Sequence, residues 1–403
     1  MQNIITEQPY QFVPPRNSWF WPTIVGAWLP HYLRRAHGVH ETHCQGVDYL
    51  KRSLDDGHGV LLAPNHCRPC DPMVLGVLAH EVGRPFFTMA SAHLFSQGRF
   101  MAWLLPRLGA FSVYREGMDR ESLKAAIDIL KRGTRPLVLF PEGVISRTND
   151  RLNHLLEGTA FIARNAAKQL AAEGSDRKVV MHPVAMRYVL QDGLPASVMT
   201  VLDRIEERLS WIPKRELPLV ERIIQVGGAL LGLKEIEHLG HVRTGELKER
   251  LAVLIDQLLI PLESEWTGGQ REANVVARVK RLRAAILPEM ISGAITEEER
   301  SRRWKHLSNL YLAQQLSLYP PDYLGNPPIP ERILETVERF EEDLTDHVTV
   351  HRPLRVLIRV GEAIVVTPGR EKGVPTDPLM QQLRDCLERD LDALRPERPE
   401  VSV

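Results

Sequence analysis

The sequence has few cysteines and no excess of charge, and both shortages narrow what it can be. Four cysteines among 403 residues are too few for a disulfide-stapled fold, so we expect a reducing compartment. Cys67 and Cys70 are spaced as a C-x-x-C pair, but no second pair completes a zinc site, and we expect no metal. The 51 basic residues are balanced by 51 acidic ones, so no overall field attracts nucleic acid.

Long apolar runs are also missing. No stretch reaches the roughly 18–20 residues that a membrane-spanning helix needs. The best candidates are 19–30, 100–113 and 222–234, and a proline interrupts each of the first two. The start of the chain has no basic region of the kind that opens a signal peptide. We therefore expect neither a transmembrane span nor a secretion signal.

One aromatic segment, 18–36, is nevertheless unusual. It gathers three tryptophans, a phenylalanine and a tyrosine, and it ends in Arg34 and Arg35. Aromatic side chains beside cations suit a helix that lies in a bilayer interface. The same residues equally suit a helix docked on the core of its own domain, and the two interpretations can hold for different faces of one helix.

What is present is an ordinary globular composition, 43% hydrophobic and 25% charged, with enough apolar material for a sizeable core. Between 45 and 190, short apolar runs alternate with helical patterns, which favours an α/β sheet covered by helices. The expected strands are 59–63, 85–89, 110–114, 136–140 and 178–189, and the expected helices are 73–80, 92–107, 119–132 and 153–172.

The pattern changes to helices alone from about 200 to 347, before one strand, 354–360, and a helix, 376–394. A single strand is not stable by itself, so we expect it to join the earlier sheet. The predicted organisation is an interfacial helix region (1–44), an α/β domain (45–199), an all-α insertion (200–347) and the returning strand and helix of the α/β domain (348–395).

The run that follows the first strand carries a histidine and an aspartate five positions apart, His66 and Asp71. A histidine is a serviceable base at neutral pH when a carboxylate fixes its tautomer. The alternative is that Asp71, just before Pro72, only caps the next helix. No G-x-S-x-G nucleophile elbow is present, so we expect the nucleophile to be a hydroxyl of the substrate. Cys67 and Cys70 keep a hydrolase open as a weaker alternative.

Two later strands also end in residues that suit ligand binding. The strand 136–140 is followed by Glu142 and Gly143, and the strand 110–114 by Arg115. Strand ends meet at one edge of an α/β sheet. There a carboxylate can accept from substrate hydroxyls, a glycine admits close backbone approach and an arginine can grip phosphate. Arg68 and Arg147 are further candidate cations, although a solvated arginine or a plain turn explains each residue singly. Together they suit acyl transfer from an activated carrier to an alcohol that bears a phosphate.

In this order, the blocks resemble the glycerolipid acyltransferase family, which includes lysophosphatidic acid and glycerol-3-phosphate acyltransferases. The blocks are His-x4-Asp at 66–71, a Gly-to-Arg block at 109–115, Phe-Pro-Glu-Gly at 140–143 and an apolar strand with proline at 180–185. The resemblance covers about 45–190. It implies the family's mixed sheet flanked by helices.

The resemblance also implies a mechanism. His66 would deprotonate the acceptor hydroxyl, which attacks an acyl thioester, and Asp71 would orient His66. Arg115, Glu142 and Gly143 would hold the glycerol-phosphate end. The donor would be acyl-CoA or acyl-carrier protein, with no further cofactor. The acceptor would be a lysophospholipid such as 1-acylglycerol-3-phosphate, or glycerol-3-phosphate, in phospholipid biosynthesis at a membrane surface. We expect a cytoplasmic protein, peripheral on the inner face of the cell membrane.

This chain departs from the family pattern after Phe-Pro-Glu-Gly. The family usually continues Thr-Arg-Ser, whereas here Val144 to Ser146 precede Arg147, which we expect to replace the usual arginine in substrate binding. Two alternatives follow: an acyltransferase for another lysolipid, alcohol or amine, or a catalytically inactive membrane-associated scaffold. In the second, the helical insertion would be the working part.

Overall fold

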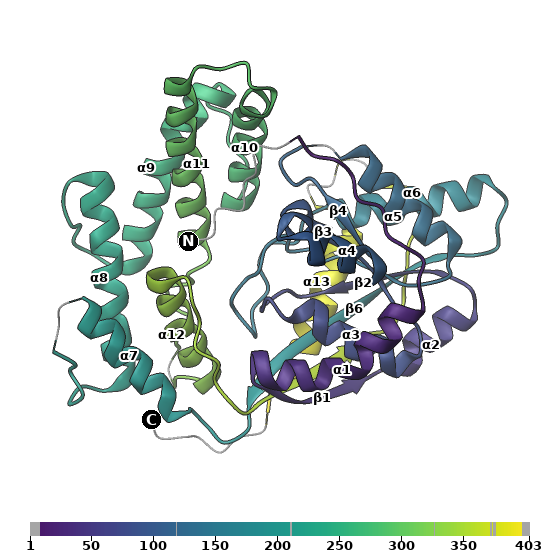
Figure 1. Ribbon diagram of the computed structural model, residues 1–403, viewed down its shortest axis with the longest axis horizontal. Coiled ribbons are helices and arrows are strands. Elements are labelled where there is room, and N and C mark those ends of the chain that lie inside the picture. The colour runs from purple at the N-terminus through teal and green to yellow at the C-terminus, as the bar shows by residue number, and fades with distance from the viewer. Residues whose placement is uncertain are drawn as a thin grey trace.

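The computed structural model describes residues 9–117, 119–209, 212–325, 327–370, 373 and 376–396. It confirms the predicted α/β fold, a mixed and mostly parallel sheet flanked by helices (Figure 1). Across the sheet the strands are β1 (Val39–Gln45), β7 (Leu354–Val360), β6 (Val179–Leu190), β2 (Gly59–Pro64), β5 (Leu137–Val138), β3 (Phe87–Ser91) and β4 (Ala110–Val113), and β8 (Ile364–Val365) pairs with β6. β7 and β8 run antiparallel to β6, and the other neighbouring strands are parallel.

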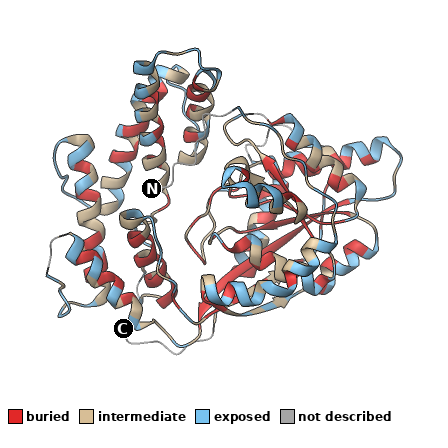
Figure 2. Cartoon of the chain, viewed as in Figure 1, coloured by how far each residue is buried: buried red, intermediate tan, exposed pale blue. Residues whose placement is uncertain are grey.

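Two apolar cores cover the two faces of this sheet. Along β2, Val60 and Leu62 belong to one core, and Leu61 and Ala63 to the other, as the two-residue repeat of a strand requires. A strand buried on both faces reads as a continuous apolar run. The first core includes α2 (Val47–Asp55) and α3 (Asp71–Val82), and the second includes α5 (Arg120–Arg132), α6 (Gly158–Ala172) and α13 (Pro378–Ala393). Buried residues accordingly concentrate on the strands and the inward helix faces (Figure 2).

The sheet begins earlier in the chain than the sequence indicated. All of β1 except Gln45 lies in the region 1–44 expected to hold only the interfacial helix, and the strand pairs in parallel with β7. Its residues alternate between inward and outward positions, because β1 is the edge strand and keeps one face toward solvent. Its polar sequence therefore gave no apolar run to recognise.

The helical insertion leaves and re-enters the sheet at adjacent positions, because Leu190 at the end of β6 pairs with Leu354 at the start of β7. It comprises α7 (Ala196–Arg208), α8 (Leu219–Leu239), α9 (Leu247–Thr267), α10 (Val275–Ser292), α11 (Glu297–Ser317) and α12 (Pro330–Thr345). Helices α8 to α11 share a core of their own. The first half of α8, through Ile223 and Val226, joins α7 and α12 in the core under the sheet, so these elements anchor the helical lobe seen in Figure 1.

The aromatic helix α1 (Phe20–His37) has one docked and one exposed face. Leu33 is buried, and Leu29 packs closely against Gly76 of α3. The opposite face exposes four large side chains, Phe20, Ile24, Trp28 and Tyr32, and Trp19 at the N-cap is exposed as well. Within the described residues, no helix has both the length and the apolarity that crossing a bilayer requires. The docked interpretation of this segment therefore holds for one face and leaves the other face free.

Candidate active site

The loop between β2 and α3 brings His66 and Asp71 together. His66 Nδ1 lies 2.8 Å from Asp71 Oδ2, and Asp71 is fully buried. The same carboxylate accepts from the Arg68 amide at 2.9 Å and from the Tyr188 hydroxyl at 2.6 Å. An acceptor at Nδ1 selects the tautomer that carries its proton there, which leaves Nε2 able to take a proton from a ligand. His66 keeps 15% of its side chain exposed, so the pair has the geometry of a general base and its orienting acid.

The helix-cap alternative for Asp71 is wrong. α3 begins at Asp71 itself, its N-cap residue is Cys70, and no side chain caps the helix. The Asp71 carboxylate is instead used by the loop and by Tyr188. Pro72 occupies the first turn, as expected from its preset backbone angle.

His66 is also held from the exit of β5. Its ring stacks on Phe140 with centroids 4.0 Å apart. Its amide donates to Glu142 Oε1 at 2.8 Å, and its carbonyl accepts from the Ser146 amide at 2.7 Å. Two strand exits that adjoin in the sheet therefore act on one histidine, through backbone as well as side-chain contacts.

Glu142 binds two backbone amides in the structure, and the substrate contact expected for it stays a prediction. Its second oxygen accepts from the Asn153 amide at 3.1 Å, so both oxygens are occupied, and the residue is only 1% exposed. Burial raises the pKa of Glu142 to about 7, against the opposing effect of the two amides. We therefore count Glu142 among the residues that position His66.

Arg115 and Gly143 meet at the exits of β4 and β5. The Arg115 guanidinium donates to the Gly143 carbonyl. Gly143 has a φ of 68°, and a Cβ at this position would lie 2.4 Å from the Leu156 side chain, so the site requires glycine. Across the described part of the chain, Arg115 forms no ion pair with a carboxylate. Burial lowers the pKa of Arg115, and the neighbouring Glu116 acts in the opposite direction.

A second guanidinium without an ion pair among the described residues comes from the helical insertion, and the sequence did not predict its place here. Arg283 lies on α10, and its Nε is buried without a hydrogen-bond partner. Burial lowers the pKa of Arg283. The charge of Glu116 acts against this effect and the charge of Arg115 adds to it, so these three side chains lie near one another. His93 belongs to the short helix η1 (Ala92–Ser96), and burial together with Arg115 lowers its pKa to about 4. No local signal in α10 distinguishes Arg283 from its basic neighbours.

Arg147 is engaged elsewhere. It has a positive φ of 58°, and its guanidinium forms an ion pair with Glu342 of α12. The substrate-binding role expected for Arg147 stays a prediction, and a ligand would have to compete with this acid.

The two cysteines of the loop are not nucleophiles. Cys67 and Cys70 are 1% and 2% exposed, and both are free thiols. Burial raises the pKa of the Cys67 thiol well above its ordinary value and that of Cys70 to about 12. A thiol attacks as its thiolate, so the hydrolase alternative built on these residues is wrong. In the described ranges, no cluster of histidine, cysteine or acidic side chains is arranged to hold a metal ion.

Comparison with known proteins agrees with this site. Residues 41–187, which hold the His66–Asp71 pair and both neighbouring strand exits, match the family described as Acyltransferase. The fold, the site and this match define an acyltransferase domain. The match and the site thus support the resemblance of this part of the chain to the glycerolipid acyltransferases. It is 32% identical over 111 residues to the 1-acyl-sn-glycerol-3-phosphate acyltransferase of Streptococcus pneumoniae, in an alignment that spans 28% of this chain and 39% of that relative.

Proposed function

We propose that the protein is an O-acyltransferase that moves a fatty acyl group from acyl-CoA or acyl-carrier protein to a hydroxyl of a glycerol-phosphate-type acceptor, such as 1-acylglycerol-3-phosphate, in phospholipid biosynthesis. The observation that carries this proposal is the His66–Asp71 pair, with Nδ1 bound at 2.8 Å and Nε2 left for a ligand. Nε2 takes the hydroxyl proton as the oxygen attacks the thioester carbonyl carbon. The carbon–sulfur bond then breaks, and the departing thiolate takes the proton back from His66.

The assay that tests this proposal supplies radiolabelled long-chain acyl-CoA, or the matching acyl-carrier protein, with each of several acceptors. We expect labelled phospholipid from lysophosphatidic acid or glycerol-3-phosphate. Transfer only to another lysolipid, alcohol or amine would keep the chemistry and replace the acceptor. Absence of transfer to every acceptor would contradict the proposal and favour the inactive scaffold.

The phosphate of the acceptor is supported by two guanidinium groups, Arg115 at the exit of β4 and Arg283 on α10, which form no ion pair among the described residues although Glu116 acts on both. A phosphate monoester carries nearly two negative charges at neutral pH, and arginine binds it through paired hydrogen bonds. We propose that the phosphate lies between these two side chains, so that the insertion helps to select the acceptor.

Replacing either guanidinium should weaken acceptor binding more than catalysis. For Arg115→Gln and Arg283→Gln we expect the KM for lysophosphatidic acid to rise roughly 10- to 100-fold, the value of a lost charge-assisted hydrogen bond. The KM for the acyl donor should stay within about 2-fold. Steady-state kinetics with each substrate varied in turn makes the measurement. Lys280→Gln is the matched control, because Lys280 is exposed on the same helix. An unchanged acceptor KM in both variants would contradict binding of the acceptor phosphate between Arg115 and Arg283.

We also propose that the protein binds the membrane surface through α1 and α4 (Arg99–Arg107). Trp21 of α1 packs edge-on against Trp103 of α4, with centroids 4.9 Å apart, and Phe100 stacks on Trp103. The two helices thus expose one set of large apolar side chains, which includes Phe20, Trp28 and Phe100. Arginines flank it, and aromatic groups beside cations suit an anionic bilayer interface. These side chains support peripheral binding to a membrane, and the inner face of the cell membrane is the location that we propose.

Vesicle flotation tests the membrane proposal. In the triple variant Phe20→Ser, Trp28→Ser and Phe100→Ser, we expect binding to vesicles of phosphatidylcholine and phosphatidylglycerol to fall at least 10-fold, because each side chain is worth about 1.5–3 kcal/mol when buried. A matched control replaces Ile212, Leu233 and Ile236, which are exposed on the insertion. Equal flotation of the aromatic variant and the wild type would show that this surface does not contribute to membrane binding.

A further inference from the structure

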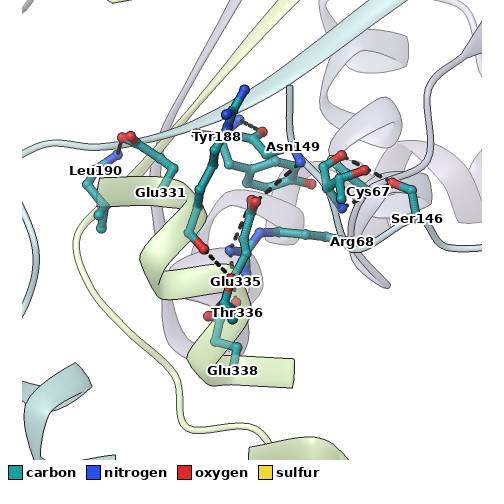
Figure 3. Close-up of polar contacts among 12 residues, drawn as sticks. Cys67, Arg68, Ser146, Asn149, Tyr188, Leu190, Glu331, Glu335, Thr336 and Glu338 are labelled. Atoms are coloured by element: carbon teal, nitrogen blue, oxygen red, sulfur yellow. Dashed lines mark hydrogen bonds and ion pairs between the residues drawn. The ribbon is translucent and has the colours of Figure 1, made fainter. Parts of the chain in front are cut away.

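Helix α12 of the insertion turns a row of glutamates toward the loops that hold the catalytic pair. Glu331, Glu335, Glu338 and Glu342 are spaced so that they share one helix face. Glu331 accepts from the Leu190 amide at 2.8 Å, and Glu342 pairs with Arg147. The two central glutamates point toward Arg68 and Asn149 (Figure 3). The insertion is therefore joined by charge to the loops that follow β2 and β5.

Arg68 carries the first connection. It lies between His66 and Asp71 in the chain, and its amide donates to Asp71. Its guanidinium lies 3.0 Å from Glu338 and 3.8 Å from Glu335, and above the ring of Tyr188 at 5.3 Å. The acids outweigh the effect of burial and raise the pKa of Arg68. A half-buried cation in the catalytic loop is thus neutralised by a helix from outside the α/β domain.

Tyr188 and Asn149 carry a second connection. The Tyr188 hydroxyl donates to Asp71 at 2.6 Å. Its backbone is bound on both sides by the Asn149 side chain, at 2.6 Å and 2.5 Å. The backbone N–H of Asn149 donates in turn to Glu335 at 3.3 Å and to the Tyr323 hydroxyl at 3.1 Å. Two separate chains of contacts therefore run from α12 to the carboxylate that orients His66.

We infer that α12 is a positioning element of the active site, in which Glu338 and Glu335 hold Arg68 and Asn149 so that Asp71 keeps His66 in its reactive orientation. The effect of α12 on the reaction rate rests on the acyl transfer proposed above. Removing one partner of a buried ion pair leaves the other charge uncompensated. Arg68 would then turn toward solvent and move the loop, and a displacement of about 1 Å at a reacting group is enough to lower a rate 100-fold.

Glu338→Gln should lower kcat roughly 10- to 100-fold and leave both KM values within about 2-fold. Arg68→Gln should do the same, and the double variant should lose no more than either single variant, because the pair acts as one unit. Glu341→Gln is the matched control. Glu341 lies on the same helix with the same 8% exposure, but it binds Thr349, at 2.6 Å and 2.7 Å, away from the catalytic loop. A kcat for Glu338→Gln equal to that of Glu341→Gln, or losses that multiply in the double variant, would overturn the inference.

A spectroscopic measurement keeps the inference separate from the proposed function and from any loss of folding. In protein labelled at histidine, the Nδ1 proton of His66 should give a protected resonance because of its bond to Asp71. We expect that resonance to shift or broaden in Glu338→Gln and to stay in place in Glu341→Gln. The shorter acid of Glu338→Asp serves if the amide variant fails to fold, and should give an intermediate shift. An unchanged resonance in a folded Glu338 variant overturns the role of α12 even if the wild type proves inactive, whereas inactivity alone overturns only the function.

Discussion

Replacing His66 with alanine is expected to lower acyl transfer by about 1,000-fold or more. The reason is geometric: His66 is the proposed base at the exit of β2, and its Nδ1 is already bound to Asp71. Alanine leaves the acceptor hydroxyl without a group to take its proton, and general-base catalysis contributes about 100- to 10,000-fold. The effect should appear in kcat, since His66 is not among the groups proposed to hold the acceptor phosphate.

Initial rates with radiolabelled acyl-CoA measure the loss, and thermal unfolding checks that the variant remains folded. His154→Ala is the control, because His154 is exposed and should keep wild-type turnover. Equal rates for His66→Ala and the wild type would contradict general-base catalysis by His66. Residual turnover that rises with added imidazole would support the base role directly.

The second large effect is expected for Asp71→Asn, with kcat lowered by roughly 100- to 10,000-fold. Asp71 accepts from His66, the Arg68 amide and Tyr188, and more weakly from the Cys67 thiol at 3.9 Å. An asparagine has one acceptor oxygen and an NH2 group that only donates. It therefore loses at least one of these bonds, and it favours the tautomer in which Nε2 carries the proton and cannot act as base.

Tyr188→Phe provides a graded comparison for this prediction. It removes one donor to Asp71 but leaves the bond to His66, so we expect a fall in kcat of at most about 10-fold. For both variants kcat and the KM for donor and acceptor should be measured. Thermal unfolding should be measured as well, because Asp71 and Tyr188 are buried and their replacement can lower stability. A kcat for Asp71→Asn within about 3-fold of the wild type would show that the carboxylate does not orient the base.

The sequence alone determined the parts of this protein that are local. The strand β2, the turn after it and the spacing of His66 and Asp71 lie within 13 residues of one another. A continuous apolar run and the proline after it are enough to predict that junction, because both act on the backbone nearby. The order of the later exits, ending in Arg115 and Gly143, follows from the same local patterns and from the rule that parallel strands share one carboxyl edge.

Tertiary structure decided which of those side chains are free to meet a ligand. Glu142 is used by two backbone amides, and Arg147 pairs with Glu342, 195 positions later in the chain. Arg115 acts on Arg283 only because the tertiary fold brings α10 of the insertion toward the exit of β4. Spacing in the sequence carries no record of such pairings, since burial and charge depend on what packs against a residue from distant parts of the chain. The sequence therefore predicted the candidate base His66 and its acid Asp71. The contacts around that pair and the arginines near it depend on how distant parts of the chain, including the helical insertion, pack against the sheet.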